Sequence, residues 1–286
     1  MRFPFLVLTP VCVFLGLSTV IAKHAPIDLL MLSLVFIGAI CAHISVNMIN
    51  EYSDFKSGLD FITHKTKFSG GSGALPQHPD VAINVLIMAI IALLIMLLIG
   101  LFFILKHGLG ILPIGILGAL LITTYTHWIN RFPMLCLISP GLGFGYLMVV
   151  GTQFVLMGHY ISLSWLVASI PFLLVNNLLL LNQYPDIKAD RKVGRKHFPI
   201  TYGIEKSNLI YALSVLMSIA IIMISILTDI LPTLSMLALL PMPLAFFAFS
   251  GAIKYKDSLG DYPQYLAANV FVTLFTPLLL AISLIV

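Results

Sequence analysis

Two short polar runs hold the residues of this chain that could bind a metal ion or a phosphate. The first reads NEYSDFKSGLD from Asn50 to Asp60, and the second reads NQYPDIKAD from Asn182 to Asp190. Each run places an asparagine four residues before an aspartate. Carboxylate and amide oxygens suit Mg²⁺, which proteins commonly hold with a few carboxylates and with phosphate oxygens of a substrate. The paired runs therefore predict magnesium-dependent chemistry on a phosphate compound.

Helical spacing would bring the polar side chains of each run to one face, because residues three and four apart are neighbours on a helix. In the first run these residues are His43, Asn47, Asn50 and Asp54. In the second run they are Asn182, Asp186 and Asp190. Pro185 disfavours an unbroken helix there. A kinked turn would still keep the two carboxylates close together.

Basic residues follow both runs and could pair with an anionic phosphate group. They are Lys65, Lys67, Arg191, Arg195 and Lys196. The plainer interpretation is that acids and bases at helix ends are solvated markers of membrane topology. Two runs with the same spacing favour a site instead, and the acids of an ion pathway would be expected within the spans rather than at their ends.

Composition places these runs in a membrane protein. Of the 286 residues 60% are apolar and 9% are charged, which is too little polar surface for a soluble globule of this size. Apolar runs of about 20 residues, enough to cross a bilayer as a helix, recur along the chain. We expect an all-α, multi-pass protein with a single domain over residues 1–286. The nine predicted spans are 5–22, 27–50, 81–105, 109–126, 133–156, 161–182, 207–228, 231–252 and 264–285.

The distribution of positive charge predicts how these spans are oriented. With nine spans, thirteen of the fifteen Lys and Arg residues fall on the side of the N-terminus, and only Lys23 and Lys106 fall on the other. The positive-inside rule then places the N-terminus and both polar runs in the cytoplasm. Two long cytoplasmic loops, 51–80 and 183–206, follow the runs and are expected to cap them.

Other features exclude alternative classes of site. The three cysteines lie in apolar segments without CxxC spacing, so neither a zinc site nor a disulfide framework is expected. The net charge of +4 is explained by topology, so we expect no nucleic-acid partner. The glycine-rich stretch 69–73 lacks the Gly-Lys-Ser/Thr ending of a P-loop, and we interpret it as a flexible lid hinge.

NEYSDFKSGLD and NQYPDIKADRKVGRK resemble the two aspartate-rich motifs of the UbiA superfamily of intramembrane prenyltransferases. The resemblance covers most of the chain, with motifs after the second and sixth spans and a long loop behind each. Glu51 stands where that family usually has an aspartate, and the SGGSGALP stretch replaces the family's Arg-Pro element. The glycine-rich stretch and the regions around Tyr125 and Pro140 are most similar to the branch that prenylates 1,4-dihydroxy-2-naphthoate in menaquinone synthesis.

The resemblance implies transfer of a polyprenyl group from a polyprenyl diphosphate to an aromatic acceptor, with Mg²⁺ as cofactor. It implies metal ligation by Asn50, Asp54, Asn182, Asp186 and Asp190, with Glu51 as a helper. It implies diphosphate contacts from Lys65, Lys67, Arg191 and Lys196. Tyr125 is expected to stabilise the allylic cation, alongside the catalytic Asp54 and Asp186, while His43 and Asn47 are expected to orient substrate.

Several alternatives stay open on the sequence alone. The acceptor could be non-aromatic, such as a glycerol phosphate lipid. A secondary transporter with repeated halves would also show two similar halves. A CDP-alcohol phosphotransferase also uses aspartates and Mg²⁺, but its D-G-x-x-A-R signature is missing here. We expect a bacterial cytoplasmic membrane location, contact with membrane lipids and no obligate protein partner.

Overall fold

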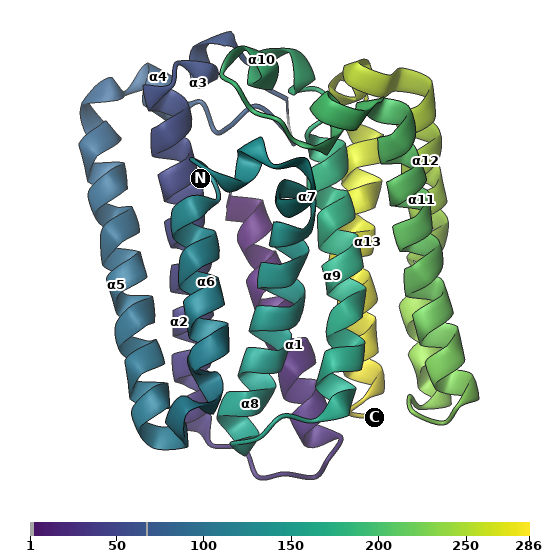
Figure 1. The fold of residues 1–286 in the computed structure, drawn as a ribbon. Helices are drawn as coiled ribbons and strands as arrows, with labels where there is room; N and C mark the ends of the chain where they lie inside the picture. Colours follow the sequence, from purple (N-terminus) through teal and green to yellow (C-terminus); the bar gives the residue numbers. More distant parts are fainter. Residues whose placement is uncertain (1–2, 67) are drawn as a thin grey trace.

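The computed structural model describes residues 3–66 and 68–286, and all regular secondary structure in these residues is helical (Figure 1). Seven helical stretches are long and apolar enough, by length and composition, to cross a membrane. They are Leu29–Lys56, Pro79–Thr124, Pro133–Met157, Ser162–Asn182, Phe198–Leu227, Thr233–Asp261 and Pro263–Ser283. A shorter apolar helical stretch covers Phe5–Ile21. The predicted all-helical class is confirmed, and these apolar helices indicate an integral membrane protein.

The longest of these stretches contains two helices, α5 (Ala82–His107) and α6 (Leu112–Thr124). They are joined at Gly108, whose φ of 76° and ψ of −167° suit glycine because it lacks a Cβ. The two helices contact each other and lie close together in Figure 1. The chain therefore reverses at Gly108.

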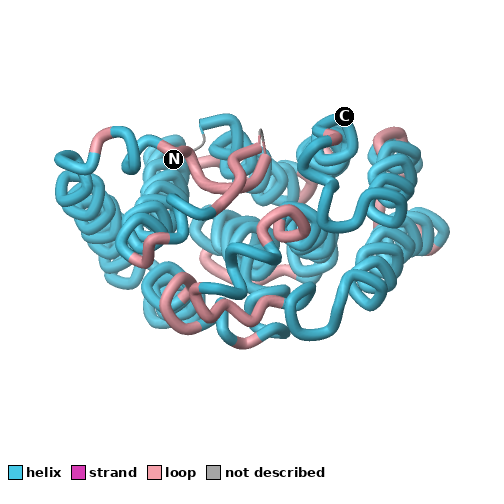
Figure 2. Tube along the Cα trace, turned by 90° about the horizontal axis from the view of Figure 1, so that it is seen from above, coloured by secondary structure: helices cyan, strands magenta, loops and turns pink. Residues whose placement is uncertain are grey.

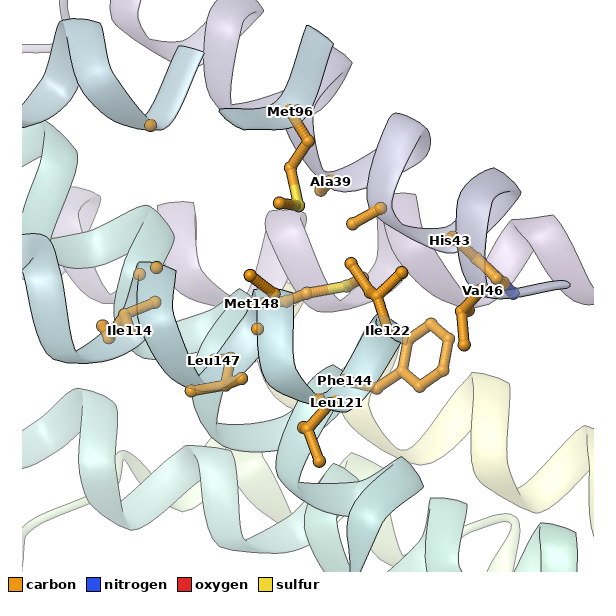
Figure 3. A pocket seen from close by; sticks show the side chains of 18 of the residues that line it. Ala39, His43, Val46, Met96, Ile114, Leu121, Ile122, Phe144, Leu147 and Met148 are labelled. Carbon is orange, nitrogen blue, oxygen red and sulfur yellow. The ribbon is translucent and has the colours of Figure 1, made fainter. Parts of the chain in front are cut away.

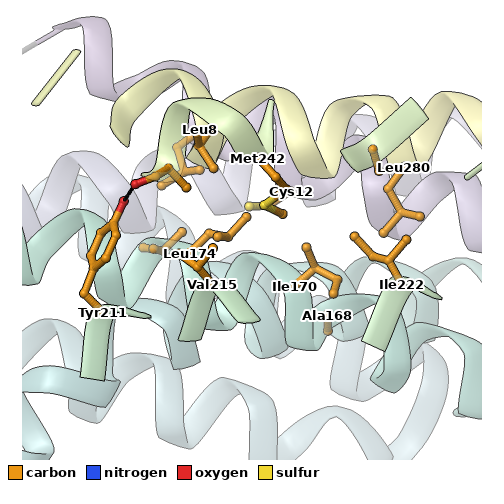
Figure 4. Close-up of a cluster of buried hydrophobic side chains, with 14 of the residues drawn as sticks. Leu8, Cys12, Ala168, Ile170, Leu174, Tyr211, Val215, Ile222, Met242 and Leu280 are labelled. Atoms are coloured by element: carbon orange, nitrogen blue, oxygen red, sulfur yellow. Dashed lines mark hydrogen bonds between the residues drawn. The ribbon is translucent and has the colours of Figure 1, made fainter. Parts of the chain in front are cut away.

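Helix α9 (Ser162–Asn182) lies at the centre of the bundle. It contacts α1 (Leu8–Ile21), α7 (Pro133–Gly141), α11 (Phe198–Leu227) and α13 (Pro263–Ser283). In the most apolar 18-residue stretch of α9, 67% is buried inside the protein, against 22% of the corresponding stretch of α2 (Leu29–Lys56). Figure 4 shows part of the packed cluster, in which Cys12, Leu174, Ile222 and Leu280 come from four different helices. This packing holds the second polar run, which follows α9, in a fixed place.

The first polar run begins on the last turns of α2 and ends in α3 (Leu59–Ile62). Asp28 caps the start of this helix by accepting hydrogen bonds from the backbone N–H groups of Leu30 (2.9 Å) and Met31 (3.1 Å). The helix continues to Lys56 because no helix-breaking residue intervenes, and Gly58 then turns the chain with a φ of 78°. The helix therefore extends six residues beyond the predicted span 27–50. Continued helix puts Asn50 and Asp54 on one face, as the spacing predicts.

The second polar run is not a single helix. Helix α9 ends at Asn182, a turn covers residues 183–186, and α10 runs from Ile187 to Lys192. Pro185 lies in the turn, where its missing N–H costs nothing. The backbone N–H of Asp190 donates to the carbonyl of Asp186 at 2.8 Å, so the two acids stay one turn apart. Helix α11 starts at Phe198 and is kinked at Gly203 (φ 85°, ψ 165°), so its long continuous part begins after Gly203, close to the predicted end of the loop at residue 206.

The segment between α7 and α8 (Gly151–Met157) is a π-helix, η5 (Leu142–Val150). It packs closely on α9, since a Cβ added at Gly145 would lie 2.6 Å from the backbone nitrogen of Phe172. The side chain of Asn176 accepts a hydrogen bond from the backbone N–H of Gly141 at 2.7 Å. Wide helical turns at this place line a cavity described below, as π-helical turns frequently do.

Short segments gather over one end of the bundle, seen from above in Figure 2. Of these, α3 (Leu59–Ile62), α4 (Ala74–Gln77) and α10 belong to the loops that follow the polar runs. A third connection, η7 (Lys256–Asp261), joins α12 (Met242–Tyr255) to α13. The described part of the chain also contains five short 3-10 helices, which are not all at this end: η1 (Phe3–Val7), η2 (Pro79–Val81), η3 (Gly108–Ile111), η4 (Ile129–Arg131) and η6 (Thr233–Leu239).

The η7 connection packs against both of the loops that follow the polar runs. A Cβ added at Gly260 would lie 2.8 Å from Cγ2 of Thr66 and 3.0 Å from Cβ of Pro185. Lys188 of α10 also forms an ion pair with Asp257 of η7 at 2.8 Å. Both side chains of that pair are exposed, so it contributes little, and the close packing at Gly260 is the stronger link.

We predict that Gly260→Ala destabilises the protein by about 1–3 kcal/mol, because the added methyl group overpacks a tight contact between rigid neighbours. Thermal unfolding in detergent measures the change. Gly100→Ala is the control, because a Cβ there would meet nothing within 4 Å. Equal melting temperatures for wild type and Gly260→Ala would show that the contact is loose.

Candidate active site beneath the cap loops

Both polar runs face one cavity of about 240 Å³. This polar cavity lies at the end of the bundle that carries the short segments. The two runs are more than 120 residues apart in the sequence, yet they line this one cavity. Its lining residues from the two runs are Asn50, Glu51, Asp54, Asn182, Gln183, Asp186 and Asp190.

A larger apolar cavity of about 640 Å³ continues from the polar one, since Asn47, Asn50, Tyr125, Leu179 and Asn182 line both. Its walls come from α2, α5, α6, η5, α8 and α9, among other elements. Figure 3 shows its aliphatic and aromatic lining, which includes Ile122, Leu147 and Phe144. The two cavities together suit a molecule with an anionic head and a long hydrocarbon tail.

An arginine joins the two polar runs across the polar cavity. Arg195 forms an ion pair with Oδ1 of Asp54 and donates from Nη1 to Oδ1 of Asp190 at 3.0 Å. Oδ2 of Asp54 accepts from the side chain of Asn50 at 3.0 Å, and Oδ2 of Asp190 lies 3.0 Å from Nε2 of His197. Burial alone would lower the pKa of Arg195, but the neighbouring Asp190 and Asp54 carboxylates raise it above its ordinary value. The guanidinium therefore stays charged.

The glycine-rich stretch lies against both runs and lines the polar cavity. The backbone N–H of Gly70 donates to Oδ2 of Asp186 at 3.1 Å, and the hydroxyl of Ser72 donates to Glu51. Gly71 has a φ of 69° and passes so close to Asp60 that a Cβ would lie 2.8 Å from its Oδ1. Glycine is therefore required for this close approach, whereas the role of a lid hinge stays a prediction.

The oxygen donors at the cavity fit Mg²⁺ that is shared with a substrate. In the described part of the chain, no three His, Cys, Asp or Glu side chains form a group that could hold a metal by themselves. Oδ1 of Asn182 is buried and has no hydrogen-bond partner, although it belongs to a residue that lines the cavity. Mg²⁺ usually keeps several positions for water or substrate phosphate, so an incomplete protein cage suits this ion.

Two further predicted residues lie at the cavities. Tyr125 follows α6, lines both cavities and places its hydroxyl 3.9 Å from Sγ of Cys136. His43 lines the apolar cavity, with Nδ1 2.7 Å from the hydroxyl of Thr9 and its ring edge-on to Phe144 (Figure 3). Both positions are compatible with contact to substrate.

The basic residues divide into two groups. Arg195 lines the polar cavity, but Lys65, Arg191 and Lys196 are exposed and do not line it. Lys67 lies outside the described residues. Residue type alone did not distinguish these positions. The distinguishing signal is Gly194, whose φ of 80° reverses the chain after α10 and returns Arg195 to the site.

Two residues of the site were missed by the sequence reasoning: His197 and Asn130 line the polar cavity. The glycine-rich stretch, interpreted from the sequence as a lid hinge, lines it as well. The backbone carbonyl of Asn130 accepts a hydrogen bond from the N–H of Lys196 at 3.0 Å, which fixes the segment that carries Arg195. No sequence pattern links Asn130 to that segment.

A buried acid beside the cavity predicts a pH dependence of stability. Asp60 is 5% exposed, and its Oδ2 is buried without a hydrogen-bond partner. Burial, followed by the nearby Glu51 carboxylate, raises its pKa from 3.8 to about 6. A raised pKa in the folded state means that the folded protein holds this proton more tightly than the unfolded chain does. Asp60 therefore favours the folded state least above pH 6, and stability falls as pH rises from about 4 to 6.

We predict that Asp60→Asn raises the melting temperature at pH 8 by roughly 2–4 °C, because it removes a buried charge. At pH 5 the gap should be smaller, and near pH 4 it should close, because Asp60 is then protonated in both the folded and the unfolded protein. Thermal unfolding of wild type and Asp60→Asn in detergent, with a chelator present, measures this gap at each pH. A gap that is the same at pH 5 and pH 8 would exclude Asp60 as the titrating group.

The sequence and the fold of this chain were each compared with known proteins. A model of the UbiA prenyltransferase family matches residues 9–275. The chain is 28% identical over 197 residues to the 1,4-dihydroxy-2-naphthoate octaprenyltransferase of Bacillus subtilis (strain 168). That match covers 65% of this chain and 60% of the length of the relative.

Solved structures share the fold at low sequence identity. A structure of digeranylgeranylglyceryl phosphate synthase has a TM-score of 0.66 at 15% identity, covering 100% of this chain and 99% of that one. An apo UbiA homologue from Aeropyrum pernix K1 has a TM-score of 0.70 at 15% identity, covering 95% and 96%. A UbiA homologue from Archaeoglobus fulgidus bound to DMAPP and Mg²⁺ has a TM-score of 0.60 at 15% identity, covering 98% of each chain.

Proposed function

Because this chain belongs to the UbiA prenyltransferase family, we propose that it transfers a polyprenyl group from a polyprenyl diphosphate to an aromatic acceptor and releases diphosphate. The observation that carries this proposal is the joined pair of cavities. Both acidic runs line the polar cavity, which would receive the diphosphate, and the apolar cavity would receive the tail.

The chain's own oxygen donors would hold Mg²⁺ on the diphosphate. The A. fulgidus homologue binds DMAPP together with Mg²⁺, which supports the same cofactor here. The ion would neutralise charge that builds on the departing diphosphate. The residues proposed as ligands are Asn50, Asp54, Asn182, Asp186 and Asp190, with Glu51 as a helper.

Residues between the two cavities would act on the allylic end of the prenyl chain. Tyr125 lines both cavities and would present its ring to the developing cation. Asn47 lines both cavities as well, and His43, held by Thr9, would orient the acceptor from the apolar side. The apolar walls exclude water, which would otherwise capture the cation.

We propose a single domain over residues 1–286 with nine membrane crossings, in which α1, α5, α6 and the α7–η5–α8 segment each count as crossings of their own. The excess of Lys and Arg on the capped side supports a cytoplasmic position for the polar cavity and both cap loops. Lys65, Arg191 and Lys196, exposed there, together with Lys67, would attract the anionic headgroup to the cavity. A bacterial cytoplasmic membrane fits this orientation.

The acceptor is proposed to resemble 1,4-dihydroxy-2-naphthoate, as the name of the B. subtilis relative suggests. A glycerol phosphate lipid acceptor is the second candidate, because the fold is also shared with digeranylgeranylglyceryl phosphate synthase. Both reactions need the same diphosphate site and differ only in the nucleophile.

The test uses purified protein in lipid vesicles with one labelled polyprenyl diphosphate, Mg²⁺ and a panel of acceptors. We expect label to move to 1,4-dihydroxy-2-naphthoate and diphosphate to be released. Transfer to a glycerol phosphate compound alone would select the second candidate. Magnesium-dependent uptake of a solute without diphosphate release would instead indicate a transporter.

A further inference from the structure

The guanidinium of Arg195 lies between two carboxylates that belong to different polar runs. One nitrogen pairs with Oδ1 of Asp54 on α2, and the other donates to Oδ1 of Asp190 on α10 at 3.0 Å. The side chain of Arg195 is 18% exposed, and those of Asp54 and Asp190 are 10% and 5% exposed. These two facing oxygens are therefore occupied by a cation that the protein itself supplies.

Local structure fixes Arg195 in this position. Its backbone N–H donates to the carbonyl of Asp190 at 3.1 Å, after the reversal at Gly194. The next residue, Lys196, donates from its backbone N–H to the carbonyl of Asn130 at 3.0 Å. The side chain, by contrast, is held by ion pairs to the carboxylates of Asp54 and Asp190.

The charges around the polar cavity explain why a cation is needed there. Glu51, Asp54, Asp186 and Asp190 line the cavity, and Arg195 is the one described lining residue with a permanent positive charge. Carboxylates at such short range repel one another and favour any cation that can bridge them. A guanidinium is always protonated and its planar fork matches two carboxylate oxygens.

We propose that Arg195 is an exchangeable counter-ion: it bridges Asp54 and Asp190 in the substrate-free protein and turns to the diphosphate when these carboxylates take Mg²⁺. This inference rests on the proposed function. Displacing Arg195 without a substrate would leave a buried guanidinium unpaired, which is unfavourable. Diphosphate oxygens give the guanidinium a new bidentate partner. Arg195 therefore makes the binding of the metal and of the diphosphate mutually dependent.

The test measures Mn²⁺ binding to the purified protein by electron paramagnetic resonance, with and without inorganic pyrophosphate. Wild type should bind Mn²⁺ weakly alone and at least about tenfold more tightly with pyrophosphate. Arg195→Gln should bind Mn²⁺ about tenfold more tightly than wild type when pyrophosphate is absent, because the competing cation is gone. The gain in Mn²⁺ affinity on adding pyrophosphate should therefore be smaller in Arg195→Gln than in wild type.

Two further variants control for folding and for charge. Arg195→Lys keeps the cation, so its Mn²⁺ affinity without pyrophosphate should stay close to that of wild type. Lys192→Gln removes an exposed cation from the same segment and should change neither affinity. If Arg195→Gln does not fold, the gain in Mn²⁺ affinity of the wild type on adding pyrophosphate still tests the inference.

The outcomes separate this inference from the proposed function. Tight Mn²⁺ binding to wild type without pyrophosphate, or no gain in Arg195→Gln, would overturn the inference while magnesium-dependent prenyl transfer persists. Failure of wild type to bind Mn²⁺ even with pyrophosphate would overturn the proposed function, and the inference with it.

Discussion

Replacing Asp54 or Asp186 with alanine is expected to lower magnesium-dependent diphosphate release by roughly 10²–10³-fold, which is typical of removing one charged group that stabilises a leaving anion. Asp54 comes from α2 and Asp186 from the turn after α9, yet both line the same cavity. Each would help to hold Mg²⁺ on the diphosphate. The measurement is release of diphosphate by purified protein supplied with geranylgeranyl diphosphate and the acceptor.

Matched variants separate loss of the site from loss of the fold. Asp54→Asn and Asp186→Asn keep the side-chain shape and should be similarly impaired, because the carboxylate charge is what each contributes. Asp80→Ala removes an exposed acid outside both cavities and should keep full activity. Normal turnover by either Asp54→Ala or Asp186→Ala would show that the acidic runs do not bind the diphosphate.

Filling the apolar cavity should shorten the prenyl chain that the enzyme accepts. Gly118 lines this cavity on α6, seven residues before Tyr125, which is about 10 Å along the helix. A Cβ at Gly118 would meet only Leu147 Cδ1, at 3.9 Å, so a larger side chain can enter the cavity. We expect Gly118→Phe to lower kcat/KM for geranylgeranyl diphosphate by about 10–100-fold, corresponding to 1–3 kcal/mol of overpacking.

Shorter donors should be affected much less, because their tails end before the new ring. The measurement is kcat/KM for geranyl and geranylgeranyl diphosphate with the same acceptor. Leu117→Phe is the matched control, since Leu117 is 42% exposed and does not line the cavity. Equal losses for the two donors in Gly118→Phe would mean that the tail takes a different route.

The sequence by itself determined the helical membrane class and the location of the acidic runs. Apolar length is a local property of the chain, and so is the step of four residues between Asn50 and Asp54 along α2. The second run was harder to predict because Pro185 breaks the helix, and the structure divides the run between α9 and α10. Its acids still face the site, because the turn is tight.

Only the tertiary structure decided which polar side chains share the cavity. Lys65, Arg191 and Arg195 are all basic residues beside the acidic runs, and no local pattern ranks them. Arg195 reaches the cavity because Gly194 reverses the chain and Asn130, distant in sequence, holds the next backbone amide. Such contacts depend on how α2, α6 and α9 pack against one another. Long-range packing of this kind leaves no periodic signal in the sequence.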